Sequence, residues 1–192
     1  MAGILLNTFF NQGLIKAANS IAANGNILTK VAVPPKIFAF ATSIAAFINF
    51  LIGLIPLTAV VYISGQSLSF AIPIVLLVGF FLVLFVAGAG LALSVIFIRF
   101  DDAKNIVNVL LLILLYLTPV FYPLSILSES MQKIVTLNPL TSFLDAFRWS
   151  FSNNASATPQ DFIYLAITGI AFFALGNFIF KKYWPRTVSI YL

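Results

Sequence analysis

The chain has 192 residues, of which 61% are hydrophobic and 8% are charged, with a formal net charge of +5, whereas a soluble domain is about 25% charged. A fold surrounded by water could not hide so much apolar surface, so the composition excludes a soluble domain and predicts an integral membrane protein. The chain has no cysteine and no histidine, which excludes disulfides, thiolate nucleophiles, histidine metal sites and histidine proton relays.

Charge-free runs predict the membrane spans. Residues 37–98 contain no charge, which is enough for two crossings of about 20 residues each and a turn. Residues 105–128 and 162–180 are also free of charge. These runs are continuous rather than alternating, which favours helices. We therefore expect an all-α membrane bundle with four full spans, at 38–63, 70–98, 106–122 and 162–180.

The first 15 residues are apolar but too short to cross a bilayer alone, and they carry Asn7, Asn11 and Gln12. They could form an interfacial helix or a partial span whose beginning is missing.

The basic residues divide unevenly between the two sides of this arrangement. Only Lys133 and Arg148 fall on one side, and the positive-inside rule makes the other side cytoplasmic, together with the C-terminus. The residues predicted to be cytoplasmic are Lys16, Lys30, Lys36, Arg99, Lys104, Lys181, Lys182 and Arg186.

Residues 16–37 are the longest polar stretch on the predicted cytoplasmic side. Ala17–Ala23 favours helix, Asn24-Gly25-Asn26 is turn chemistry, and Pro34-Pro35 sets the entry angle of the next span. The stretch is either an ordinary connection or a short helix presented to a partner, and the spacing leaves both open.

Small residues and an acidic pair mark the next connection. Gly88 and Ala92 form a small-xxx-small step, which favours close helix packing, either within the bundle or at a dimer seam. Asp101-Asp102 could suggest a membrane enzyme that holds a metal and a diphosphate, but such a site needs a second acidic cluster on the same side. The remaining acids, at positions 129, 145 and 161, fall on the other side, so we expect no metal site and no enzyme.

The stretch 116–150 is too long and too apolar for a simple loop. The third span breaks at Pro119 and Pro123, and a short amphipathic helix follows, with Leu127, Met131 and Ile134 on one face. Asn138 suits an N-cap and Pro139 a first helical position, which starts another helix over about 139–150. Two short helices after a broken span predict an external re-entrant hairpin.

Aromatic side chains gather in and around this hairpin. They suit sliding contact with sugar rings, although an interfacial aromatic belt is the alternative. Asp145 and Arg148 are three residues apart on the same predicted helix and could pair. The aromatic residues are Tyr116, Phe121, Tyr122, Phe143, Phe147 and Trp149.

If this chain moves a substrate across the membrane, the energy for transport must come from another protein. The chain lacks the G-x-x-x-x-G-K-[ST] motif of P-loop nucleotide sites, and no ionisable residue falls in the middle of a predicted span, where gradient-driven transporters usually need one. We therefore expect a partner ATPase on the cytoplasmic side.

Four stretches together resemble the permease subunits of ABC-2 type exporters, in the group that exports polysaccharides and polyol phosphates such as O-antigen, capsule and teichoic acid. The stretches are Ala2-Gly3 with Phe9-Phe10, then Asn24–Pro34, then Arg99–Asp102, and finally Thr118–Pro123 with Leu137–Leu140 and Phe147-Arg148. The resemblance covers the whole chain. It implies a six-span fold in which this chain begins inside the second span, as if truncated at the N-terminus.

The resemblance also implies site residues. Residues 1–192 would form a single transmembrane domain, with 16–37 as a cytoplasmic coupling segment and 116–150 as an external gate. The residues implied to dock on the ATPase are Asn24, Asn26, Leu28, Lys30, Pro34, Arg99 and Asp102. The residues implied for the gate and substrate path are Tyr116, Pro119, Phe121, Tyr122, Pro123, Asn138, Pro139 and Arg148.

The implied protein is a multi-pass permease subunit of the bacterial cytoplasmic (inner) membrane. It would pair with a second copy of itself and with two ATPase subunits that bind ATP and Mg²⁺, and would itself bind no cofactor and no nucleic acid. It would move a lipid-linked polysaccharide or polyol phosphate outward. One alternative is an ABC-2 permease for small hydrophobic drugs or lipids, and one of another class is a small pore-forming or scaffold membrane protein.

Overall fold

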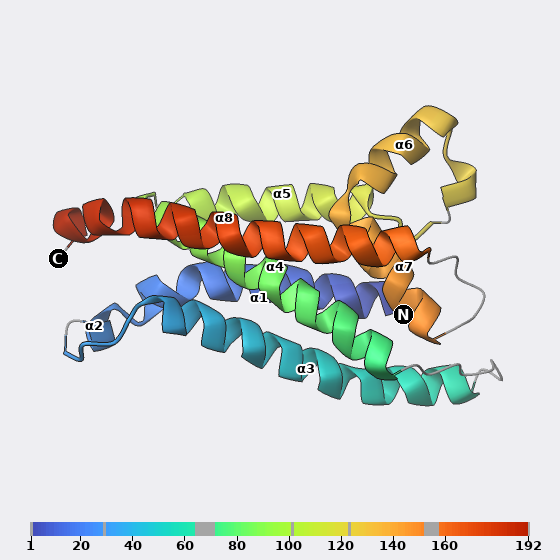
Figure 1. Cartoon of the computed structure of the whole chain (residues 1–192), viewed down its shortest axis with the longest axis horizontal. Helices are drawn as coiled ribbons and strands as arrows, with labels where there is room; N and C mark the ends of the chain where they lie inside the picture. The colour runs from blue at the N-terminus through green and yellow to red at the C-terminus, as the bar shows by residue number, and fades with distance from the viewer. Residues whose placement is uncertain are drawn as a thin grey trace.

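The computed structural model describes residues 2–28, 30–63, 72–100, 102–122, 124–151 and 158–191, which form helices and short connections and contain no strand. This confirms the all-α fold class (Figure 1). The elements, in chain order, are α1 (Ala2–Ala23), α2 (Gly25–Leu28), α3 (Lys36–Ile63), α4 (Ile72–Arg99), α5 (Ala103–Leu117), the 3₁₀ turn η1 (Leu124–Ile126), α6 (Glu129–Leu137), α7 (Pro139–Phe151) and α8 (Pro159–Tyr191).

Three of these helices are long and apolar enough to cross a membrane, over Lys36–Ile63, Pro73–Arg99 and Pro159–Pro185. They coincide with the first, second and fourth predicted spans. The remaining predicted span, 106–122, is shorter than expected, because α5 ends at Leu117 after 15 residues. At 1.5 Å per residue such a helix covers about 22 Å, less than the roughly 30 Å hydrocarbon core.

The early end of α5 has a local cause. Thr118 is extended, with φ −91° and ψ 134°, as expected for a residue that precedes proline, since the proline ring disfavours helical geometry there. Pro119 therefore ends the helix, and the chain turns before it reaches Pro123, which lies outside the described residues.

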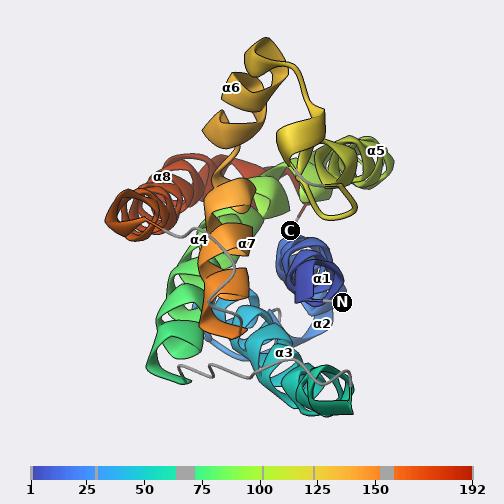
Figure 2. The same cartoon turned by 90° about the vertical axis from the view of Figure 1, so that its right-hand side faces the viewer.

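Helix α1 runs along the bundle between α3 and α5 (Figure 2), so it is part of the bundle rather than a separate interfacial helix. Leu6, Phe10 and Ala17 are at most 2% exposed. It runs antiparallel to α3, because Phe9 stacks near Phe50, with ring centroids 5.1 Å apart, while Gly13, further along α1, lies against Ala46, which is earlier in α3.

Helices α4 and α8 run parallel and touch through their backbones. A Cβ atom on Gly88 would overlap the backbone of Phe172 and Phe173, and one on Gly176 would overlap the backbone of Gly88. Close approach of this kind is what small residues permit. The prediction of close packing at Gly88 within the bundle is confirmed.

The two ends of the bundle differ in charge. The end of α1, the start of α3, the end of α4, the start of α5 and the end of α8 all lie at the left of Figure 1. These helix ends and the turn after α2, which contains Lys30, carry the basic residues that were predicted to share one side, apart from Lys16. The first residues of the predicted coupling segment, 16–23, are the last turns of α1 rather than a separate helix, and Ala18 and Ile21 are at most 1% exposed there.

Candidate functional site

The break after α5 is fixed by a side chain from a distant helix. Arg148, near the end of α7, donates from Nη2 to the carbonyl oxygen of Pro119 at 3.0 Å and to that of Val120 at 3.1 Å. These carbonyls belong to a chain that has left the helix, so no helical N–H is available to them. A charged donor makes a stronger hydrogen bond than a neutral one, and Arg148 therefore holds the turn onto α7.

Asn138 forms a second link between the break and α7. Its Nδ2 donates to Thr118 Oγ1 at 2.9 Å, and its Oδ1 accepts from the backbone N–H of Leu140 at 3.1 Å. The second bond satisfies one of the free N–H groups at the start of α7, with Pro139 in the first helical position, so the predicted cap is confirmed. Both polar atoms of this buried side-chain amide, Oδ1 and Nδ2, therefore have a hydrogen-bond partner.

Two tyrosines add further hydrogen bonds to this region. Tyr122 donates its hydroxyl to the carbonyl of Tyr116 at 2.9 Å, across the break. Tyr164, on α8, donates to the carbonyl of Leu137 at 2.9 Å. Tyr164 could not be singled out from the sequence, because its partner is a backbone carbonyl at the end of a short helix.

Helix α6 stands away from the bundle beside η1 (Figure 2). The predicted apolar face is present but is not covered, since Met131 is 52% and Ile134 is 51% exposed. Leu127 precedes the helix, which begins at Glu129. An exposed apolar face next to the end of a membrane bundle is typical of an interfacial helix.

Only some of the predicted aromatic residues are accessible. Phe143 and Phe147 are fully buried, with Phe147 packed against Phe50 at 5.2 Å between ring centroids. For these two residues, both contact with sugar rings and a place in an interfacial belt are excluded, because α7 turns this face into the core. Tyr116 and Phe121 are 65% and 62% exposed.

Asp145 and Arg148 influence each other electrostatically in α7, which lies outside the three spanning helices. Burial raises the pKa of the Asp145 carboxyl, and the positive charge of Arg148 partly opposes this. Burial likewise lowers the pKa of Arg148, and Asp145 opposes that change. The predicted pairing is therefore limited to this electrostatic influence, because the Nη2 of Arg148 is directed at the carbonyl groups of Pro119 and Val120.

The structure thus joins most of the predicted gate residues in one network. Pro119, Asn138 and Arg148 lie around the break, and Pro139 starts α7. The hydroxyl of Tyr122 donates a hydrogen bond to the backbone carbonyl of Tyr116. Phe121 is exposed beside them.

The predicted coupling residues lie at the opposite end, in two groups. One group surrounds α2, where Asn26, Lys30 and Pro34 are exposed. Asn24 donates to the carbonyl of Ser20 at 2.7 Å, and Leu28 packs against the cluster that contains Ile21. The other group is the connection between α4 and α5, with Arg99 at the end of α4 and Asp102 at the cap position of α5.

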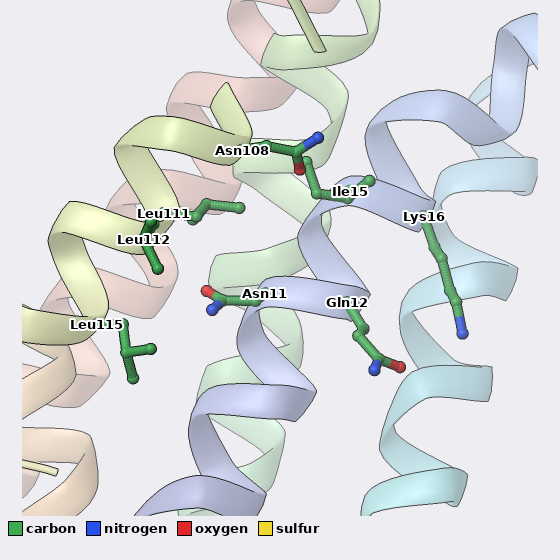
Figure 3. Close-up of a pocket in the computed structure, with 8 residues that line it drawn as sticks. All are labelled: Asn11, Gln12, Ile15, Lys16, Asn108, Leu111, Leu112 and Leu115. Carbon is green, nitrogen blue, oxygen red and sulfur yellow. The ribbon is translucent and has the colours of Figure 1, made fainter. Parts of the chain in front are cut away.

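A pocket between α1 and α5, lined by both polar and apolar side chains, was not predicted. It has a volume of about 350 Å³ and is lined by Asn11, Gln12, Ile15, Lys16, Asn108, Leu111, Leu112 and Leu115 (Figure 3). The sequence does show polar residues in these otherwise apolar helices, which could have indicated a pocket. Only the fold, however, brings those of α1 and α5 together.

Comparison with known proteins agrees with these features. Residues 1–152 match the family described as ABC-2 type transporter. Over 194 residues, the chain is 26% identical to an O-antigen export system permease protein RfbA of Klebsiella pneumoniae, covering 99% of this chain and 73% of the relative. Over 183 residues, it is 24% identical to the protein of the same name from Myxococcus xanthus, covering 94% of this chain and 70% of the relative.

Proposed function

The chain belongs to the ABC-2 type transporter family, and from this premise we propose that it is the membrane permease subunit of an ATP-driven exporter of a lipid-linked polysaccharide or polyol phosphate. The relatives that it resembles over nearly its whole length are named as O-antigen export permeases. The family and these names support the polysaccharide export group over a drug or lipid permease and over a pore or scaffold.

The observation that carries the proposal is the network around the break after α5. Three stretches that are far apart in sequence meet there through Arg148, Asn138 and the carbonyls of Pro119 and Val120. The same three stretches carried the most specific part of the family resemblance. Their shared role is to hold one short hairpin at the end of the bundle.

The hairpin acts as the external gate in this proposal. Four spans, α3, α4, α5 and α8, together with the partial span α1, would enclose the membrane part, and η1, α6 and α7 would form a re-entrant hairpin at the outer face. The short α5 and the exposed apolar face of α6 support this arrangement. The basic end of the bundle, which includes the C-terminus, would face the cytoplasm.

The partners follow from the same premise. Two copies of the permease would pair with two ATPase subunits, which bind ATP and Mg²⁺, while the permease binds no cofactor and catalyses no reaction. Residues Asn24–Pro34, with Arg99 and Asp102, would dock on the ATPase. The exposure of Asn26, Lys30, Pro34, Arg99 and Asp102 at the basic end of the bundle supports this assignment.

Glycan export in cells tests the proposal directly. Cells that lack the permease gene should accumulate the lipid-linked glycan on the inner side, and expression of the chain with its ATPase should restore glycan at the surface. The matched control is an ATPase whose P-loop lysine is replaced, which should abolish export. Unchanged surface glycan combined with altered drug efflux would favour the drug permease, and ion currents from the purified chain alone would favour a pore.

A further inference from the structure

The bundle carries an apolar groove on the side formed by α3, α4 and α8. The groove has a volume of about 390 Å³, and Figure 2 shows α4 between α3 and α8 on this side. Two of its lining residues, Ile44 and Phe80, are 53% and 55% exposed, so the groove is open to the surroundings of the bundle. All of its lining residues are apolar, namely Phe40, Ile44, Phe47, Phe80, Val83, Leu84, Ala87 and Phe173.

One end of this groove carries positive charge. The rings of Phe40 on α3 and Phe173 on α8 lie 5.7 Å apart between centroids. One turn beyond this pair, toward the basic end of the bundle, Lys36 donates from Nζ to Asn177 Oδ1 at 3.4 Å. Asn177 is itself fixed, because its Nδ2 donates to the carbonyl of Phe173 at 3.0 Å. Lys36 therefore links α3 to α8 where the apolar groove ends.

Two lysines at this end can bind an anion. The ammonium group of Lys36 has three N–H donors, and its hydrogen-bond partner among the described residues is Asn177, so donors remain for a ligand. Lys181 follows Asn177 by one turn, on the same face of α8, and is exposed. The neighbouring Lys182 is directed elsewhere, because its Nζ lies over the ring of Phe178, 5.8 Å from the centroid.

The groove has the length of one acyl chain. Phe47 lies three helical turns after Lys36 in α3, which is about 16 Å along the axis at 1.5 Å per residue. One leaflet occupies half of a hydrocarbon core of about 30 Å. An apolar chain that starts at Lys36 therefore reaches the far end of the groove near the middle of the membrane. A polar ligand suits this wall poorly, because its polar groups would be left without partners there.

We propose that this groove binds one anionic phospholipid from the leaflet at the basic end of the bundle, with its phosphate at Lys36 and Lys181 and one acyl chain along the apolar wall. The negative headgroup complements the two lysines, and the acyl chain complements the aromatic and aliphatic side chains. A zwitterionic lipid offers the same chain, but the positive group in its headgroup is repelled by the lysines. The inference depends on the chain being a membrane protein and is independent of the cargo that it exports.

Lipid retention by the purified protein tests the site. The full chain is purified in a neutral detergent and mixed with equal amounts of dioleoylphosphatidylglycerol, which is anionic, and dioleoylphosphatidylcholine, which has the same acyl chains and no net charge. Native mass spectrometry then counts the lipids bound to each chain and the chains in each assembly. The parent should retain one phosphatidylglycerol per chain, in several-fold excess over phosphatidylcholine. Equal retention of the two lipids would overturn the inference.

Substitution of the lysines tests the headgroup site. Lys36→Ala and Lys181→Ala should each weaken retention of phosphatidylglycerol about fivefold, which is the contribution of one basic residue near an anionic membrane surface. Lys182→Ala is the matched control and should retain the lipid like the parent, because Lys182 is directed at an aromatic ring. Circular dichroism verifies that each variant is folded. Parent-level retention by the double variant of Lys36 and Lys181, or an equal loss in Lys182→Ala, would overturn the inference.

Ile44→Trp tests the apolar wall without changing any charge. The larger side chain should fill the groove and reduce retention of phosphatidylglycerol several-fold. Ile48→Trp, one turn further along α3, is the matched control, because Ile48 is 52% exposed and does not line the groove. If a second copy of the chain covered the groove instead, Ile44→Trp would separate the assembly into single chains and leave lipid retention unchanged, and that result would overturn the inference.

Discussion

The two ends of the bundle are built in opposite ways. At the end that carries α6 and α7, side chains bridge long sequence distances, with Arg148 reaching Pro119 and Val120 and Asn138 reaching Thr118. At the basic end, the segment around α2 is held mainly by local bonds, such as those from Ile27 and Leu28 to the carbonyl of Asn24. The end with α6 and α7 is therefore held together by contacts between distant parts of the chain, whereas the basic end presents exposed side chains.

We therefore expect the end with α6 and α7 to determine the stability of the permease, and the basic end to determine its association with the ATPase. Substitutions in the hairpin network should destabilise the permease itself, because they leave backbone and side-chain groups without partners. Substitutions around α2 should leave the fold intact and act on association with the ATPase. Each prediction below tests one side of that division.

Arg148→Leu should have the largest effect. It removes the hydrogen bonds to Pro119 and Val120 and leaves Asp145 without its nearby positive charge. We expect a loss of about 3 kcal/mol, since a hydrogen bond from a charged group contributes about 1.5–3 kcal/mol. Thermal unfolding of the purified protein in detergent measures this. The control Lys133→Leu, on the exposed side of α6, should unfold like the parent, and an equal loss in both variants would contradict the assignment.

Asn138→Leu should cost about 2 kcal/mol, because it removes the cap of α7 and the bond to Thr118, each worth about 1 kcal/mol. A double-mutant cycle with Thr118→Val isolates the second bond. We expect a coupling of about 1 kcal/mol between these positions. Additive losses would mean that the bond contributes nothing to stability.

Asp145→Asn should give a small gain in stability at neutral pH. Burial raises the pKa of Asp145 in the folded protein, so the fold favours the protonated form. The parent then loses stability as the pH rises through the raised pKa, whereas the asparagine variant does not titrate. The advantage of the variant should disappear below the unfolded carboxyl pKa of about 3.9. Unfolding temperatures measured across pH check this, and an advantage confined to low pH would refute it.

Lys30→Ala should change the stability of the permease by less than about 0.5 kcal/mol, because Lys30 is exposed. The variant should nevertheless weaken co-purification of the ATPase. Lys181→Ala, an exposed lysine at the same end of the molecule, is the matched control and should retain the ATPase. Equal retention by Lys30→Ala would remove Lys30 from the docking surface.

The sequence predicted the spanning helices well, because uncharged runs of this length have few alternatives. It placed α3 within two residues of its observed start, at Lys36 instead of 38. It extended the third span to 122, although the proline at 119 ends α5 at Leu117. The cap at Asn138 could be predicted because it is local, whereas the reach of Arg148 to Pro119 depends on tertiary packing.

The aromatic residues and the pocket between α1 and α5 mark the limit of sequence reasoning. Phe143 and Phe121 look alike in the sequence, but one is fully buried and the other is 62% exposed, because only the packing of α7 decides which face is covered. Asn11 was visible as a polar residue in an apolar stretch. Its position opposite Asn108 depends on how α1 and α5 are placed, and no local pattern specifies this.

The backbone contact between α4 and α8 constrains how this protein can change shape. Where Gly88 meets Gly176 there is no layer of side chains between the helices, and therefore nothing that could change rotamer and adopt a second packing. Hinge and shear motions need such a layer or a free connection. We therefore expect α4 and α8 to move as one rigid unit, and a rearrangement that opens a path through the bundle to occur elsewhere, with α5 the first candidate because it leaves a pocket against α1.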